Sequence, residues 1–123
     1  MDFLGNVNVF KGSVRDGKAD LGSMEVAYPE YPEGEARAVT GFARAHELDI
    51  LHAPNGRPSM RANIVRISPA RPLVRVRLYS EDFRLHLNVD LSWDRYSELD
   101  LSAGQTVYVA PRKMRIFVQD YQI

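Results

Sequence analysis

The clearest pattern in the sequence is an alternation of apolar and polar side chains in Leu73-Val74-Arg75-Val76-Arg77-Leu78-Tyr79. Successive side chains of a β-strand point to opposite faces, so the valines and Leu78 share one face while the arginines and Tyr79 share the other. Residues 83–91 repeat the alternation, with apolar side chains at the odd positions, after a short polar connection at 80–82. These two segments predict an antiparallel hairpin with one buried face and one face in water.

The sequence before this hairpin also predicts short strands separated by turns. Asp16-Gly17 is a strong turn signal because both residues readily adopt positive φ, so two strands are expected to meet there. Prolines and a glycine predict a loop at 28–34, and a further strand is expected from Ala36 to Ile50. Residues 52–59 form the most turn-rich break in the chain.

One short helix is expected, at Trp93–Leu99, because Ser92 can cap its first turn. Strands are expected after it at 106–110 and 114–118. Many short strands, regular turns and little helix favour an all-β small barrel or sandwich. The length of 123 residues fits a single domain, residues 1–123, and the break at 52–59 is the expected seam between two subdomain-sized halves.

Composition excludes several classes of function. Sixteen basic and sixteen acidic side chains cancel, so no net field attracts the domain to nucleic acid or to acidic lipid. The chain contains no cysteine, which excludes disulfides, thiolate metal ligands and cysteine nucleophiles. No apolar run approaches the roughly 18 residues of a membrane span, and no signal peptide opens the chain.

The residues around Gly12 resemble a phosphate-binding loop but fail at the decisive position. The stretch from Gly12 to Ala19 matches that loop except for its last residue, where a serine or threonine hydroxyl should bind Mg²⁺. The residues that follow, 20–23, do not predict the helix whose N–H groups would face the phosphates. A hairpin turn is the favoured interpretation.

No other constellation predicts catalysis. The three histidines, at positions 46, 52 and 86, are far apart in sequence and do not have the spacing of metal ligands. The carboxylate pairs Asp94 with Glu98 and Glu81 with Asp82 are typical of solvated surface, and no serine lies in a nucleophile elbow. The sequence therefore predicts no catalytic, cofactor-binding or metal-binding residue, and no enzymatic activity for this chain.

A local basic face is the one binding feature. The alternation places Arg75, Arg77, Arg84 and His86 on the outer face of the hairpin, beside Tyr79. On a small barrel, basic and aromatic side chains together can hold single-stranded nucleic acid. The zero net charge favours a solvated face or a protein contact instead.

Four stretches resemble the ATP-binding subunits of sulfate/thiosulfate ABC importers. Residues Asp2–Gly12 are similar to the segment that follows the nucleotide-binding domain in that family. Phe42–Ile50 resembles its Arg-Pro-His/Glu segment, with Ala45 in place of the proline. Arg61–Ser68 and Ala103–Arg112 resemble later strands, so the resemblance covers nearly the whole chain in order.

The resemblance implies a TOBE-type regulatory domain, which is an OB-like small barrel (TOBE/MOP-like) of short antiparallel strands with one short helix. Such a domain would have no chemistry of its own. It implies that ATP and Mg²⁺ bind in an N-terminal ATPase domain that precedes the segment seen here, and Met1 is then not the native start. The Ser-Ala-Arg-Asn opening of related molybdate-binding domains is absent, so no sulfate or molybdate site is predicted.

The same resemblance implies the partners and location of the domain. These are the ATPase domain of the same parent chain, a second copy of the parent in a homodimer, and membrane permease subunits indirectly, at the cytoplasmic face of the inner membrane. The implied interface or regulatory residues are Phe3, Gly5, Asn6, Arg44, His46, Glu47 and Arg112. The alternative hypothesis is a freestanding OB-like binder of single-stranded nucleic acid, which is the less favoured of the two.

Overall fold

The computed structural model describes residues 7–119, and these residues form mostly β-structure. Ten strands, one short helix and one 3-10 turn are present in this range. The strands are β1 (Val7–Arg15), β2 (Lys18–Leu21), β3 (Met24–Ala27), β4 (Arg37–Arg44), β5 (Leu48–Leu51), β6 (Met60–Ala70), β7 (Leu73–Ser80), β8 (Leu85–Ser92), β9 (Thr106–Pro111) and β10 (Arg115–Val118). The 3-10 turn η2 is Ala45–Glu47, and the helix α1 is Trp93–Leu99. The predicted all-β class with one short helix is confirmed.

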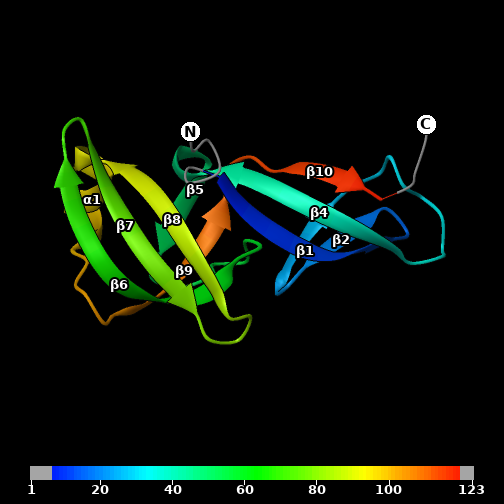
Figure 1. The fold of residues 1–123 in the computed structure, drawn as a ribbon, viewed down its shortest axis with the longest axis horizontal. Coiled ribbons are helices and arrows are strands. Elements are labelled where there is room, and N and C mark those ends of the chain that lie inside the picture. Colours follow the sequence, from blue (N-terminus) through cyan, green and yellow to red (C-terminus); the bar gives the residue numbers. More distant parts are fainter. Residues whose placement is uncertain (1–6, 120–123) are drawn as a thin grey trace.

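The strands form two five-stranded sheets that lie end to end along the long axis of the molecule (Figure 1). The first sheet has the order β10-β4-β1-β2-β3, and the second has the order β5-β9-β6-β7-β8. Every pairing is antiparallel. The chain passes from the first sheet to the second at η2 and returns between β9 and β10.

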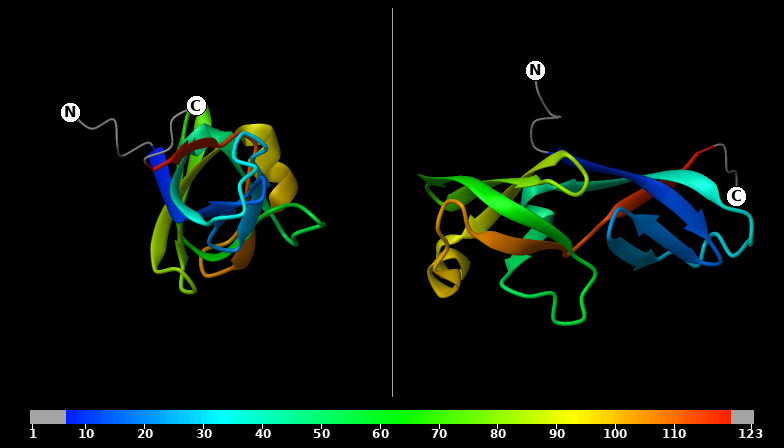
Figure 2. Two further views of the ribbon diagram at one scale, coloured as in Figure 1. Left: turned by 90° about the vertical axis from the view of Figure 1, so that its right-hand side faces the viewer. Right: turned by 90° about the horizontal axis from the view of Figure 1, so that it is seen from below.

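The second sheet curls into a small barrel. Its two edge strands, β5 and β8, contact each other, and α1 packs against β7 and β8. The end-on view of Figure 2, in which the first sheet lies nearest the viewer, shows the strands curving around the long axis of the molecule. This closure accounts for the OB-like architecture, because a sheet whose edges meet leaves few unpaired backbone groups.

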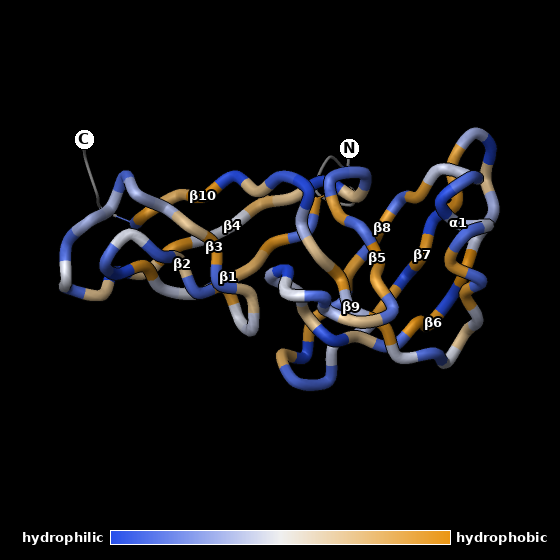
Figure 3. Tube along the Cα trace, turned by 180° about the vertical axis from the view of Figure 1, so that it is seen from behind, coloured by the Kyte–Doolittle hydropathy of each residue, from blue (hydrophilic) through white to orange (hydrophobic). Residues whose placement is uncertain are grey.

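The hairpin of β7 and β8 is confirmed, with one correction at its turn. Along β7 the buried residues alternate with residues that reach solvent, as Figure 3 also shows in the hydropathy of this strand. Phe83 and Arg84 do not belong to β8, which begins at Leu85. Arg84 has a left-handed backbone with φ of 52°, and Phe83 is 41% exposed, so the alternation starts only after them.

The single strand expected from Ala36 to Ile50 is wrong, because η2 interrupts it. The backbone N–H of Arg44 donates to Oε1 of Glu47 at 2.8 Å, and this local hydrogen bond favours a turn over continued pairing. The strand that follows, β5, belongs to the other sheet and is buried at all four residues. The chain therefore changes sheet before it reaches 52–59, and two separate halves divided at 52–59 remain a prediction.

The hairpin interpretation of residues 12–19 is confirmed. Asp16 and Gly17 both have positive φ, at 54° and 76°, and join β1 to β2. Gly12 is required for close packing and not for a positive φ, because a Cβ there would overlap the backbone carbonyl oxygen of Asp20. The glycines of this stretch therefore serve a tight turn and a close approach between two strands.

Both ends of α1 have capping residues. The side chain of Ser92 accepts a hydrogen bond from the backbone N–H of Arg95 at 3.1 Å, which confirms the predicted cap. At the other end, Asp100 has a left-handed backbone with φ of 51° and ends the helix. The helix is thus positioned directly after β8, where Arg95 can reach across the barrel.

Truncation of the two leucines at the start of β8 should have unequal effects on stability. Leu87 is fully buried, whereas Leu85 is half-buried. We expect Leu87→Ala to lower the free energy of unfolding by about 2–5 kcal/mol, since it leaves a cavity in the core. Leu85→Ala should lower it by less than half as much. Urea unfolding of both variants measures the difference, and equal losses would contradict this burial pattern.

Candidate functional site

The two places where the chain passes between the sheets lie side by side. We call residues 44–49 and 111–115 the crossing segments. The backbone N–H groups of Arg112 and Lys113 donate to the carbonyl oxygen of Glu47 at 2.7 and 3.3 Å. Next to them, β5 pairs with β9, with Leu48 opposite Pro111. The outgoing and returning segments are therefore fixed to each other by backbone hydrogen bonds.

Glu47 is a buried carboxylate at this crossing, only 8% exposed. Nη1 of Arg115, on β10, donates to its two oxygens at 2.8 and 3.1 Å. The hydrogen bond from Arg115, together with the one from the N–H of Arg44, lowers the pKa of Glu47 from 4.5 to about 2. Glu47 thus links η2 to a strand of the first sheet as a charged group.

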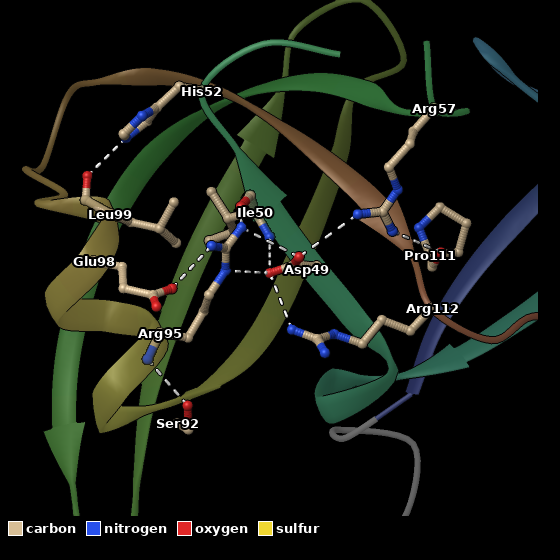
Figure 4. Close-up of polar contacts among 10 residues, drawn as sticks. All are labelled: Asp49, Ile50, His52, Arg57, Ser92, Arg95, Glu98, Leu99, Pro111 and Arg112. Atoms are coloured by element: carbon tan, nitrogen blue, oxygen red, sulfur yellow. Dashed lines mark hydrogen bonds and ion pairs between the residues drawn. The ribbon is translucent and has the colours of Figure 1, made fainter. Parts of the chain in front are cut away.

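Asp49, on β5, is the second buried carboxylate, at 6% exposed (Figure 4). Arg95 of α1 donates two hydrogen bonds to this carboxylate, from Nε to Oδ1 at 3.1 Å and from Nη2 to Oδ2 at 3.3 Å. The same guanidinium donates to the carbonyl oxygen of Ile50 at 3.1 Å. Because α1 follows β8 directly, Arg95 connects the two edge strands of the barrel and helps to close it.

Two further arginines converge on Asp49. Nη2 of Arg112 lies 3.2 Å from Oδ1, and Nη1 of Arg57 lies 3.7 Å from Oδ2. Burial alone would raise the pKa of Asp49, but the hydrogen bonds from Arg95 and the Ile50 N–H, with the positive charge of Arg112, lower it. One carboxylate therefore holds together the helix, the loop after β5 and the returning crossing segment.

Asn8, on β1, joins the two sheets at another point. Its Nδ2 donates to the carbonyl oxygens of Ala43 at 3.2 Å and Asn88 at 3.0 Å, and its Oδ1 accepts from the N–H of Asn88 at 2.8 Å. Asn88 lies on β8, an edge strand of the second sheet. The buried amide of Asn8 therefore satisfies backbone groups that this edge would otherwise leave unpaired.

The structure brings three of the sequence-predicted interface residues together. Arg44, Glu47 and Arg112 meet at the crossing segments through the bonds given above. His46 is exposed on the same turn. The predicted residues Phe3, Gly5 and Asn6 lie outside the described residues.

Sequence reasoning missed Asn8, Asp49, Arg57, Arg95 and Arg115 as members of this arrangement. Asp49 carries a recognisable signal, because it is a charged residue within the apolar run Leu48 to Leu51. A charge in a buried strand requires a partner, and an arginine is the natural one. Its three partners come from distant parts of the chain, so their convergence depends on the fold.

The basic face of the hairpin is smaller than the alternation predicted. Arg75 forms a bidentate pair with Asp90, with nitrogen–oxygen distances of 2.7 and 2.8 Å. The rings of Tyr79 and His86 lie against each other with centroids 4.7 Å apart. Arg84 lies in the turn outside the strand. Much of this face is therefore engaged in contacts within the protein.

Two general properties hold for residues 7–119. No group of three or more histidine, cysteine or acidic side chains there could hold a metal ion. In the same range, no helix is both long and apolar enough to span a bilayer.

Comparison with protein families matches both parts of the chain in succession. Residues 8–50 match the model of the CysA C-terminal regulatory domain, and residues 54–112 match the model of a TOBE-like domain. Together the two models take in most of the chain.

Several full-length proteins are similar over nearly the whole chain. The sulfate/thiosulfate import ATP-binding protein CysA of Nitrosomonas europaea is 36% identical over 118 residues, which is 94% of this chain and 33% of the relative. The protein of the same name in Bacillus cereus is 30% identical over 119 residues, 97% of this chain and 33% of the relative. The chain thus spans about a third of the length of these relatives.

A solved structure confirms the fold class. The cytoplasmic molybdate-binding protein ModG, with molybdate bound, is similar with a TM-score of 0.67 over 89% of this chain and 94% of that chain. The sequence identity is 16%, so the likeness concerns the fold alone.

Loss of the Asn8 amide should weaken the join between the sheets. Asn8→Ala leaves the partly buried N–H and carbonyl of Asn88 without these side-chain partners, and we expect it to lower the free energy of unfolding by about 2–3 kcal/mol. Ser23→Ala removes a hydrogen bond to the Ser59 carbonyl oxygen on the exposed surface and should cost less than about 1 kcal/mol. Urea unfolding compares them, and similar losses would show that Asn8 does not hold the sheets together.

The lowered pKa of Glu47 predicts a specific dependence on pH. Its contribution to stability is complete above pH 4.5, the ordinary pKa, and is lost as the pH falls towards about 2. Glu47→Gln should therefore lower the free energy of unfolding by about 1–3 kcal/mol at pH 7, and the deficit should shrink between pH 5 and pH 2. Glu25→Gln, at an exposed position of β3, is the matched control. A deficit that stays constant with pH would rule out the charged pair as its cause.

Proposed function

Because the chain belongs to the family of CysA C-terminal regulatory domains and continues into a TOBE-like domain, we propose that it regulates the ATP-binding subunit of a sulfate/thiosulfate ABC importer. The observation that carries this proposal is the ordered match of both family models over residues 8–50 and 54–112. Relatives named as sulfate/thiosulfate import ATP-binding proteins align with nearly all of the chain but only a third of their own length.

In this proposal the parent protein performs the chemistry elsewhere. ATP and Mg²⁺ bind in an ATPase domain that precedes this chain, and the parent acts as a homodimer beneath membrane permease subunits on the cytoplasmic face. The domain itself binds no ATP and has no catalytic residue. The match of the chain to a regulatory domain, and not to the remaining two thirds of its relatives, supports this division.

The proposed contact surface is the exposed part of the crossing segments, formed by η2 with Arg44, His46 and the adjacent Arg112, which we call the crossing turn. Arg44, His46 and Arg112 are exposed there, while Glu47 and Asp49 fix the backbone beneath them. A rigid turn that presents cations suits an interface because little conformational entropy is lost when a partner binds. Phe3, Gly5 and Asn6 precede β1 and would form the joint with the ATPase domain.

A chimera tests the proposal directly. The matching third of the Nitrosomonas europaea relative is replaced by this chain, and sulfate uptake is measured in a host that lacks its own ATP-binding subunit. We expect uptake well above that of the same relative truncated before the replaced segment. Uptake no higher than that of the truncated protein would contradict the proposed function.

Point variants of the chimera test the contact surface. Arg44→Ala with His46→Ala should change uptake or its coupling to ATP hydrolysis at least severalfold, because both side chains are exposed on the crossing turn. Lys18→Ala removes an exposed cation from β2, away from the turn, and should leave uptake unchanged. If all these variants behave like the parent chimera, the crossing turn is not the contact surface.

A further inference from the structure

The outer face of the first sheet carries an apolar surface next to its edge strand β10. Residues opposite each other in neighbouring strands share a face, so Val9, Phe42 and Arg115 form one row across β1, β4 and β10. Phe117 lies in the next row, and its ring meets that of Phe42 edge to face with centroids 5.5 Å apart. Phe117 is 62% exposed, so this apolar surface is ordered but open to solvent.

A shallow pocket of about 290 Å³ lies on this face. It is lined by Val7, Phe42, Ala43, Arg44, Arg115 and Phe117. Apolar side chains thus lie directly beside basic ones, and a contiguous apolar surface with a polar rim is typical of a binding site.

Positive charge gathers at one end of this surface. Arg44 is the last residue of β4 and Lys113 comes two residues before β10, so the antiparallel pairing puts them at the same end. Both residues are exposed, and neither forms an ion pair in the part of the chain that the structure describes. The sequences of β1, β4 and β10 contain no acidic residue, and the nearby Glu47 is already paired with Arg115. A further carboxylate is therefore favoured at this end.

The same edge offers free backbone hydrogen-bonding groups. Among the described strands, β10 is the end strand of its sheet and pairs only with β4. The N–H of Gln119 donates to the carbonyl oxygen of Ala38 at 2.9 Å, and bonded pairs recur at every second residue of an antiparallel ladder. The N–H and C=O groups of Ile116 and Val118 therefore point away from β4, towards the open edge.

We propose that this edge binds an extended, acidic segment of another protein as an additional strand beside β10. The outward backbone groups of β10 supply the hydrogen bonds, and the apolar surface accepts one side chain of the segment. A carboxylate of the segment then lies at the end that carries Arg44 and Lys113. The site goes beyond the proposed function, because an open strand edge binds such a segment whether or not the parent is an importer.

A titration with probe peptides tests the proposal on the full chain. The probe has about seven residues, an ordinary strand length, with a central phenylalanine, a glutamate two residues to either side and threonine elsewhere. The control peptide has lysine in place of both glutamates. The probe is symmetrical, so a glutamate reaches the basic end in either strand direction.

The titration has two readouts. We expect the glutamate peptide to bind at least about fivefold more tightly than the lysine peptide, as for one or two exposed ion pairs. Amide hydrogen exchange measured by NMR should slow selectively at Ile116 and Val118 when it binds. Equal affinities, no binding of the glutamate peptide, or unchanged exchange at these two amides would overturn the proposal. Protection that grows with protein concentration without peptide would also overturn it, because a second copy would then occupy the edge.

Variants of the chain separate the two parts of the site. Phe117→Ser should weaken binding of both peptides, since each carries the phenylalanine. Arg44→Ala with Lys113→Ala should abolish the preference for the glutamate peptide, whereas Lys18→Ala, an exposed cation on β2, is the matched control and should preserve it. A double variant that keeps the full preference would refute the assigned role of charge.

Discussion

A buried carboxylate sets the central constraint of this molecule. Asp49 lies in a strand that is otherwise apolar, and a charge removed from water must be matched by opposite charge and by hydrogen bonds. The chain satisfies it with Arg95 from the helix, Arg112 from the returning segment and Arg57 from the loop after β5. The helix, the returning segment and the loop after β5 are thus all held to Asp49 on β5. Closure of the barrel and the second crossing between the sheets therefore both involve this one side chain.

The junction between the sheets shows how the domain is suited to a regulatory role. Glu47 ties the crossing turn to β10, and Asn8 ties β1 to the edge of β8. These hydrogen bonds connect elements of both sheets. A displacement of one sheet is therefore expected to move the other sheet with it. Such a body conveys orientation from one partner to another, as expected of a regulatory domain within a larger subunit.

Local patterns predicted much of this fold, and long-range pairing accounts for what they missed. The alternation in 73–79, the Asp16-Gly17 turn and the Ser92 cap each depend on residues close in sequence, and all three are present. The break at Ala45–Glu47 was missed although the hydrogen bond from Arg44 to Glu47 is local, because the partner that matches the buried charge of Glu47 is Arg115, from the far end of the chain. For the candidate site, Arg44, His46, Glu47 and Arg112 were predicted as interface residues and this role stays a prediction, whereas Arg57 and Arg95, which also bind Asp49, were not predicted.

The position of β10 bears on how the protein is made. Within the first sheet, β4 pairs with β1 on one side and with β10 on the other, although β10 is the last of the described strands in the chain and is made long after β1 and β4. Until then one side of β4 has no partner, and the whole second barrel must be synthesised in between. A strand edge left open during translation can pair with another chain, so completion of the first sheet is a late step that competes with aggregation.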